Sequence, residues 1–129
     1  MIKPNSFDAQ HGLIIVAARI WGPTGDAGAT LALDTGATTS VVDTKLLALI
    51  GYDPAAIPQR VRMTTGSGIE FAPKFPVERI QALGQGRSQF PILAHTLPPN
   101  VSVDGLLGLD FLRALRLTID FRKGQITLR

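Results

Sequence analysis

The stretch of sequence that decides the fold is residues 31–43, which read LALDTGATTSVVD. An apolar segment ends at Asp34, a threonine and a glycine follow, and small polar residues then lead into two valines. A carboxylate at the end of a segment that would otherwise be buried is costly unless it has a compensating partner or a function. Asp34 is therefore the first candidate for a catalytic residue.

The tripeptide that begins at Asp34 has the composition of a rigid catalytic turn. Gly36 allows a tight turn and a close backbone approach, and the hydroxyl group of Thr35 can fix the turn by hydrogen bonding. Two carboxyl groups held a few Å apart share one proton, because they cannot both ionise cheaply. The ionised group can then draw a proton from water while the protonated group polarises a substrate carbonyl. A turn capped by Asp34, without catalysis, is the structural alternative.

The second carboxyl group is not obvious, because the chain has a single Asp-Thr-Gly. Asp104, followed by Gly105, is the nearest analogue but lacks the threonine. We interpret it as a turn former rather than as a catalytic partner. Symmetry is the other source, since a twofold homodimer brings Asp34 of each subunit to the axis.

The composition of the 129-residue chain is that of one globular domain, residues 1–129. Hydrophobic residues make up 45% and charged residues 18%, so the chain can bury a core and is not of the disordered class. The absence of cysteine excludes disulfides, thiol catalysis and cysteine-ligated metals. His11 and His95 lack the spacing of a histidine metal site, and we expect no metal or cofactor.

The net charge of +3 is spread along the chain and does not predict a nucleic-acid surface. Such a surface usually has dense basic runs with aromatic residues between them, whereas this chain has one mild basic cluster near its C-terminus. No apolar run reaches the ~20 residues that span a bilayer, and residues 1–10 lack the apolar core of a signal peptide. We expect a cytoplasmic protein, with a soluble fragment of a longer anchored or secreted protein as the alternative.

Glycine and proline recur at short intervals, which predicts many short strands. Residues 59–65 and 69–75 flank a Gly-Ser-Gly segment and predict a hairpin, whose tip is either a mobile lid or an ordinary turn. Two short helices are expected, one over residues 44–50 after an N-cap at Asp43 and one over residues 109–115. The other predicted strands cover residues 12–20, 29–33, 40–42, 77–83, 88–97, 117–121 and 125–129, with a turn at 21–28.

Two motifs in this order resemble those of the retropepsin-like aspartic protease family. LDTGATTSVV, residues 33–42, resembles the family's active-site segment. GLLGLDFL, residues 105–112, resembles its second hallmark, a hydrophobic pair and a glycine that open the C-terminal helix. The hairpin predicted between them stands where the family has its flap, so the likeness spans residues 12–129. It implies an all-β fold, a closed retropepsin-like (acid protease) β-barrel with one or two short helices, in a single-domain, homodimeric enzyme of the cellular or bacterial type.

The resemblance implies a role for each residue that matches a family position. Asp34 is the expected catalytic aspartate, Thr35 the residue that interlocks the two active-site loops, and Gly36 the one that presents its carbonyl to the substrate backbone. The substrate-binding residues implied in the same way are Ala37, Thr38, the flap-tip residues Gly66, Ser67 and Gly68, and the pocket-wall residue Leu106.

The likeness also leaves alternatives open. Viral members commonly have an acid where Thr38 stands and an arginine where Leu109 stands, and here both charges are absent together. Residues 125–129 match the terminal strand that interleaves with that of the partner subunit. The implied activity is hydrolysis of peptide bonds in a peptide or protein substrate by water that the paired Asp34 carboxylates activate. A catalytically inactive peptide- or protein-binding module on the same fold is one alternative, and a basic protein that binds nucleic acid is another.

Overall fold

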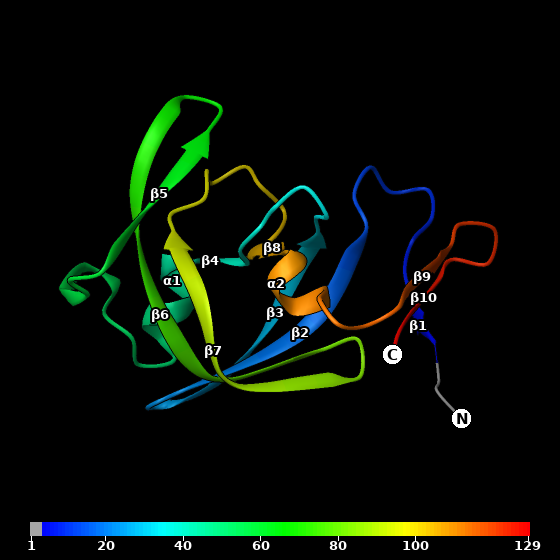
Figure 1. Cartoon of the computed structure of the whole chain (residues 1–129), viewed down its shortest axis with the longest axis horizontal. Helices are drawn as coiled ribbons and strands as arrows, with labels where there is room; N and C mark the ends of the chain where they lie inside the picture. The colour runs from blue at the N-terminus through cyan, green and yellow to red at the C-terminus, as the bar shows by residue number, and fades with distance from the viewer. Residues whose placement is uncertain (1–3) are drawn as a thin grey trace.

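The computed structural model describes residues 4–129 and consists mainly of β-strands (Figure 1). Within residues 4–129, two short α-helices and one 3₁₀ turn interrupt the strands. No helix in this part of the chain is long and apolar enough to cross a membrane. In chain order the elements are β1 (Asn5–Ser6), β2 (Ile15–Gly22), β3 (Gly25–Leu33), β4 (Val41–Asp43), α1 (Thr44–Leu49), η1 (Pro54–Ala56), β5 (Arg60–Thr65), β6 (Gly68–Ala82), β7 (Gln85–His95), β8 (Gly105–Leu107), α2 (Leu109–Leu112), β9 (Leu117–Asp120) and β10 (Gln125–Leu128).

Most strands belong to one sheet that closes on itself. The strand order β2-β3-β8-β4-β7-β6 continues to β5, and β6 also pairs with β2. This additional pairing places Ile20 opposite Ile80 and closes the ring. β3 and β8 run parallel, with Leu31 opposite Gly105. The closed all-β barrel with two short helices that was expected from the sequence is therefore confirmed.

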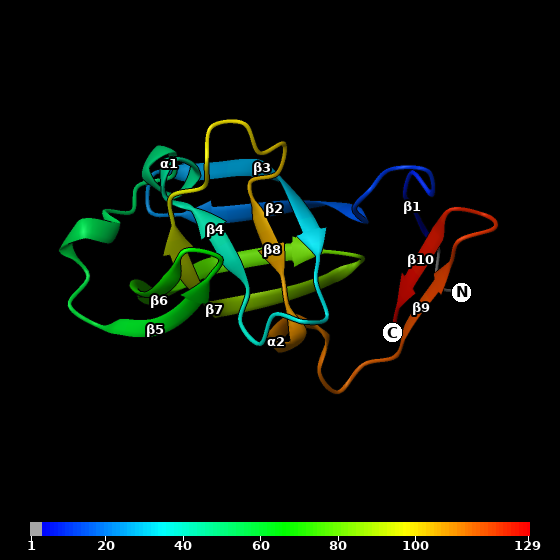
Figure 2. The same cartoon turned by 90° about the horizontal axis from the view of Figure 1, so that it is seen from above.

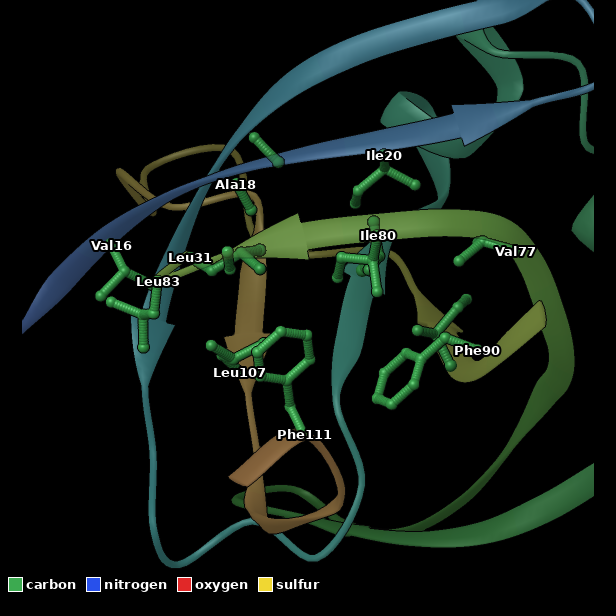
Figure 3. Packing of buried hydrophobic residues seen from close by; sticks show 14 of the residues in the cluster. Val16, Ala18, Ile20, Leu31, Val77, Ile80, Leu83, Phe90, Leu107 and Phe111 are labelled. Atoms are coloured by element: carbon green, nitrogen blue, oxygen red, sulfur yellow. The ribbon is translucent and has the colours of Figure 1, made fainter. Parts of the chain in front are cut away.

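Strand β2 illustrates how the sequence pattern forms the core. Its residues alternate between the barrel interior and the exterior, with Val16, Ala18 and Ile20 buried, as the two-residue period of a strand requires. Figure 3 shows these side chains in the barrel interior together with Leu31 of β3 and Phe111 of α2. Because Phe111 is 0% exposed, helix α2 is anchored in the barrel core by its own side chain.

The hairpin of β2 and β3 differs from the prediction. The predicted turn at 21–28 is too long, because the two strands extend into it and Gly22 pairs with Gly25, which leaves only residues 23 and 24 as the turn. Packing explains the glycine at this position, since a Cβ at Gly22 would collide with the carbonyl oxygen of Ile50 and the ring of Tyr52. Gly22, which the sequence pattern assigned to the turn, is therefore the last residue of strand β2.

The long strand β6 replaces two predicted strands, residues 69–75 and 77–83. It is continuous although it contains prolines. Pro76 lies opposite Pro91 of β7, so neither residue has to donate a backbone hydrogen bond to the other. β6 pairs first with β5 and then with β7 and β2. The predicted hairpin, here called the flap (β5 and β6), and the barrel therefore share one uninterrupted strand.

The sequence predicts the N-cap of α1 correctly but places the end of the second helix too far along the chain. α1 begins after Asp43, whose carboxylate accepts a hydrogen bond from the Lys45 N–H, as expected of an N-cap. The second helix was predicted over residues 109–115, but α2 ends at Leu112. Ala114 has a φ of +68°, in the left-handed region that ends a helix.

A separate sheet, here called the terminal sheet (β1, β10 and β9), carries both chain ends. Its strand order is β1-β10-β9, so strands of the same chain pair with β10 on both sides. The hairpin predicted from residues 117–121 and 125–129 is confirmed, with each strand one residue shorter. Figure 2 shows this sheet beside the barrel, connected to it by the segment that follows α2.

Strand β8 was not predicted, because its three residues show no alternation in the sequence. It lies between β3 and β4, and Val41 of β4 is opposite Leu106. Gly105 has no room for a side chain there. A Cβ would overlap the carbonyl oxygen of Val41 and come within 3.1 Å of the Val42 Cα atom.

Replacing Gly105 with alanine should therefore destabilise the fold. The added methyl group would push β8 and β4 apart, and overpacking of this kind costs about 1–3 kcal/mol. Urea unfolding would report the loss as a lower midpoint. Gly12→Ala is the matched control, since a Cβ at Gly12 meets no atom within 4 Å. An unchanged midpoint in the Gly105→Ala variant would contradict the packing argument.

Candidate active site

Asp34 lies where the chain leaves strand β3. Its backbone N–H donates a hydrogen bond to the carbonyl oxygen of Leu107 in β8 at 2.9 Å. Its side chain is half-buried. Figures 1 and 2 show that the loop after β3 passes next to helix α2. The parallel neighbour β8 therefore fixes the point from which the Asp34 side chain projects.

The carboxylate of Asp34 is oriented by its own turn. Oδ1 accepts a hydrogen bond from the Gly36 N–H at 2.8 Å, and the Asp34 carbonyl oxygen accepts one from the Ala37 N–H at 3.2 Å. Oδ2 has no hydrogen-bond partner among residues 4–129. The geometry is that of an Asp-capped turn that leaves one carboxylate oxygen available to a water molecule or a second carboxyl group.

Behind this turn, Ser40 and Asp110 form a buried brace. Ser40 is 0% exposed. Its Oγ donates a hydrogen bond to Asp110 Oδ1 at 2.7 Å, and its backbone N–H donates to Oδ2 of the same carboxylate at 2.9 Å. Oγ also accepts a hydrogen bond from the Gly108 N–H at 3.0 Å. The hydroxyl group is thus used as donor and acceptor at once, and it joins the two sequence motifs.

The brace was not predicted from the sequence. Asp110 lies in the first turn of α2, where an acid is ordinarily explained by the helix dipole. Ser40 was noted only as part of a short extended segment. The two residues are 70 positions apart, so no local pattern pairs them. The one available signal was a serine placed directly before two valines, a polar group at the edge of a buried strand.

The loop between the turn and the brace is held from the second motif as well. The Leu109 N–H donates a hydrogen bond to the Ala37 carbonyl oxygen at 2.8 Å. This backbone contact and the brace support the corner where the resemblance indicated a missing acid–arginine pair at Thr38 and Leu109. Thr35, Gly36 and Thr38 are exposed, and Ala37 is half-buried. The predicted loop residues are therefore accessible to a bound molecule.

The flap tip lies apart from this loop. Gly66, Ser67 and Gly68 are exposed, and Gly68 has a φ of +127°, which favours glycine. The Thr65 hydroxyl organises the turn, because it accepts a hydrogen bond from the Ser67 N–H at 3.3 Å and contacts the Gly68 carbonyl oxygen at 3.2 Å. Within the described part of the chain, no hydrogen bond joins the flap tip to the Asp34 loop.

An apolar cluster connects the base of the flap with the second motif. Val41, Ala72 and Leu93 are buried together, and half-buried residues pack against them. Leu106, predicted to wall a side-chain pocket, is one of these half-buried residues, and the others are Val61 and Met63 of β5. The structure thus brings Leu106 of β8 together with the flap strand β5 in one apolar cluster.

Asp104 has a structural role. Its Oδ2 accepts a hydrogen bond from the Thr30 N–H at 2.8 Å, and its own N–H donates to the Thr30 carbonyl oxygen at 2.7 Å. Thr30 precedes Asp34 by four residues on β3, a distance of about 13 Å along a strand. Asp104 therefore joins β8 to β3 and does not supply a second carboxyl group to Asp34 of the same chain.

Other polar groups lie outside the site. A cavity of about 740 Å³ opens between the flap base and α1, and none of the predicted site residues lines it. In its wall, His95 Nε2 is 3.8 Å from Glu70 Oε2. Burial raises the pKa of the Tyr52 hydroxyl, which accepts a hydrogen bond from the Glu78 N–H at 2.8 Å. Among the described residues, no group of three or more histidine or acidic side chains is arranged to hold a metal ion.

Comparison with known proteins gives one family match. Residues 16–111, more than half of the chain, match the family model described as Aspartyl protease. Curated protein sequences give no match. Among solved structures, a retropepsin-like aspartic protease from Rickettsia conorii has a TM-score of 0.67 at 14% identity, over 98% of this chain and 89% of that one.

Two further structures have the same fold. The EIAV protease, solved in complex with the inhibitor HBY-793, has a TM-score of 0.58 at 20% identity and covers 81% of this chain and 88% of its own. The retroviral protease-like domain of Ddi1 from Leishmania major has a TM-score of 0.59 at 15% identity, with 93% and 96% covered. At these identities the likeness concerns the fold, and the expected retropepsin-like barrel is confirmed.

Replacing Ser40 with alanine should weaken the fold through the brace. The change leaves the Asp110 carboxylate and the Gly108 N–H without their common partner, and an unsatisfied buried polar group costs about 1–3 kcal/mol. The midpoint of urea unfolding measures this loss. Ser88→Ala, at an exposed position on β7, should leave the midpoint unchanged. Equal stability of both variants would mean that the brace does not hold the site together.

Proposed function

Because the chain belongs to the aspartyl protease family, we propose that it is an aspartic endopeptidase that hydrolyses peptide bonds. The observation on which the proposal depends is the way in which the Asp34 carboxylate is held in place. Its carboxylate stands on a turn braced from the second motif, with Oδ1 held by Gly36 and Oδ2 available. Rigid support of this kind is what a catalytic carboxylate needs, because its geometry is set before the substrate binds.

The proposed active site contains two copies of Asp34, one from each subunit of a homodimer. One chain contributes a single Asp-Thr-Gly, and the nearest alternative acid, Asp104, is engaged with Thr30. A twofold axis beside the turn supplies the second carboxyl group. The exposed Thr35 is then available to interlock the two turns.

In the proposed reaction, a water molecule between the two Asp34 carboxyl groups attacks the substrate carbonyl carbon. The ionised carboxylate takes a proton from the water, while the protonated one transfers its proton to the carbonyl oxygen. A tetrahedral diol results. Transfer of a proton to the amide nitrogen then allows the C–N bond to break. Since one of the two groups has to stay protonated, we expect activity at acidic to mildly acidic pH.

The proposed substrate is an extended peptide or protein segment with apolar side chains near the bond that is cut. Leu106, Val61 and Met63 supply an apolar wall between the flap and the second motif, and burial of apolar side chains there favours such residues. The remaining predicted substrate-binding groups are those of the Asp34 loop and the flap tip, namely the Gly36 carbonyl, Ala37, Thr38, Gly66, Ser67 and Gly68.

The direct test is the Asp34→Asn variant. It removes the acid–base group but keeps its size and its hydrogen-bond acceptor for the Gly36 N–H, so the fold should persist while cleavage of a mixed peptide pool falls by several orders of magnitude. Asp53→Asn, at an exposed position whose side chain caps no helix, is the matched control and should cleave as the wild type does. Cleavage by the Asp34→Asn variant at the wild-type rate would refute the assignment.

The same variant also tests the shared site. If each active site needs two intact Asp34 residues, an equal mixture of wild-type and Asp34→Asn chains, after subunit exchange, should keep about a quarter of the activity, whereas independent sites would keep about a half. Wild-type protein that binds peptides or a transition-state mimic such as pepstatin, and cuts no peptide, would favour the peptide-binding module instead.

A further inference from the structure

The sheet divides into a fork at the base of the flap. β7 pairs with β6 as far as Leu93, opposite Lys74, and its end then follows β4, whereas β6 continues into the flap with β5 alone (Figure 1). The cavity of about 740 Å³ lies in this fork, since residues 70–73 of β6 and 94–96 of β7 line it. We propose that the fork binds an extended, apolar peptide segment of a partner protein, which adds to the free edge of β6 as a further strand.

Pro73 explains why the two strands separate. If the register of Lys74 and Leu93 continued, Pro73 would face Ala94, but a proline has no N–H to donate to the Ala94 carbonyl oxygen. Leu93 donates its own N–H to the Ser40 carbonyl oxygen, on the β4 side, at 3.0 Å. The backbone groups of the next residue, Ala94, therefore point to the opposite side, toward the fork. In the described part of the chain, β6 gives Ala94 no ladder partner.

The edge of β6 that faces the fork is unpaired as well. Lys74 donates its N–H to the Gln59 carbonyl oxygen at 3.2 Å, and in an antiparallel ladder hydrogen-bonded pairs of this kind alternate with pairs that are not hydrogen-bonded. The pair of Arg62 and Phe71, three steps further along, belongs to the second kind. The N–H and C=O groups of Phe71 therefore point away from β5, into the fork. Among residues 4–129, β5 is the only strand that pairs with residues 68–73.

The walls of the fork suit an apolar strand. Alanines line the cavity at positions 48, 55, 72 and 94, so side chains of a bound segment have room between the walls. The ring of Phe71 is 65% exposed at the same place, and covering an aromatic ring with apolar groups is favourable. Main-chain hydrogen bonds to a free strand edge, together with pockets for alternate side chains, are the way in which sheets recognise extended peptides.

The charges in the walls of the fork balance each other. Lys45 and Arg60 supply two positive charges, and Asp53 and Glu70 supply two negative ones. Glu70 also has a neighbour in His95, whose Nε2 atom is 3.8 Å from the Glu70 carboxylate. A balanced set of charges gives a polyanion no net attraction. The main chain and the apolar side chains of the occupant should therefore determine binding, which favours a peptide over a nucleic acid.

A segment in the fork would connect the flap to the barrel. On one side it would contact the outer half of β6, which belongs to the flap, and on the other side the end of β7, which belongs to the barrel wall. Asp34 and the other predicted site residues do not line this cavity. Binding in the fork is therefore independent of the catalytic carboxylate, and its effect on cleavage would pass through β6.

Amide hydrogen exchange, followed by NMR, tests the free edge without any ligand. The N–H group of Phe71 should exchange at least tenfold faster than that of Ala72, because Ala72 belongs to a hydrogen-bonded pair with Val61 of β5. Equal protection of the two amides would mean that the edge of β6 is already closed, and would overturn the proposal.

A selection from a phage-displayed library of random linear peptides tests the occupant. The Asp34→Asn variant serves as the target, because it should not cut the peptides. Selected peptides should be rich in β-branched and aromatic residues and should bind, as labelled synthetic peptides, in fluorescence anisotropy. Phe71→Pro removes the ring and an N–H group that β5 does not use, and should weaken binding at least tenfold. Ile69→Pro lies on the same edge but outside the cavity, and should change binding less than threefold.

Two tryptophan variants on α1 test the cavity itself. Ala48 and Leu49 are both exposed, but only Ala48 lines the cavity. Ala48→Trp should fill the fork and abolish binding of the selected peptides, whereas Leu49→Trp should leave it unchanged. A selection that yields no binding peptide would overturn the proposal. Peptides whose affinity neither Phe71→Pro nor Ala48→Trp lowers would overturn it too.

Cleavage assays separate this site from the proposed function. A protein that cuts no peptide but binds the selected peptides in the fork would support this site and count against the endopeptidase assignment. A protein that cleaves peptides, and whose selected peptides are displaced by pepstatin and insensitive to Ala48→Trp, would keep the assignment and overturn this site.

Discussion

The hydrogen bonds between Ser40 and the Asp110 carboxylate join the two halves of the site, and the geometry of the rest depends on them. Ser40 is fully buried, so its hydroxyl group has no water to replace a lost partner. Asp110 belongs to the helix whose Phe111 is anchored in the barrel core. The position of Asp34 is therefore set by the core itself, through α2, the brace and the short loop that precedes β4.

A brace between a buried hydroxyl group and a half-buried carboxylate differs physically from an ion pair at an exposed corner. The resemblance implied a position where viral relatives pair an acid with an arginine, and this chain has Thr38 and Leu109 there. In their place it uses the Ser40–Asp110 contact and a backbone hydrogen bond from Leu109 to Ala37. Exposed ion pairs are screened by salt, whereas buried hydrogen bonds are much less affected. The rigidity of this site should accordingly depend little on ionic strength.

Sequence patterns predicted those structural features whose signal lies within a few neighbouring residues. The N-cap at Asp43, the flap hairpin and the hairpin of β9 and β10 each have their signal within a few residues of sequence. Strand β8 was missed because a three-residue strand is defined by its neighbours β3 and β4, not by its own alternation. The break in α2 at Ala114 and the Ser40–Asp110 contact were missed for the same reason, since tertiary packing overrides propensity and pairs residues far apart. Asp34 could be proposed as a candidate from the sequence because its motif is contiguous.

The continuity of β6 sets how the flap can move. A lid on a flexible loop swings about one or two backbone torsions, but here the outer half of β6 lies in the flap and the inner half is paired within the barrel wall. Opening must bend the strand itself, and the ladder next to the bend resists it. The flap and the barrel share strand β6, so a change that loosens the pairing of β6 within the barrel also loosens the flap. A change that stiffens this pairing slows flap opening.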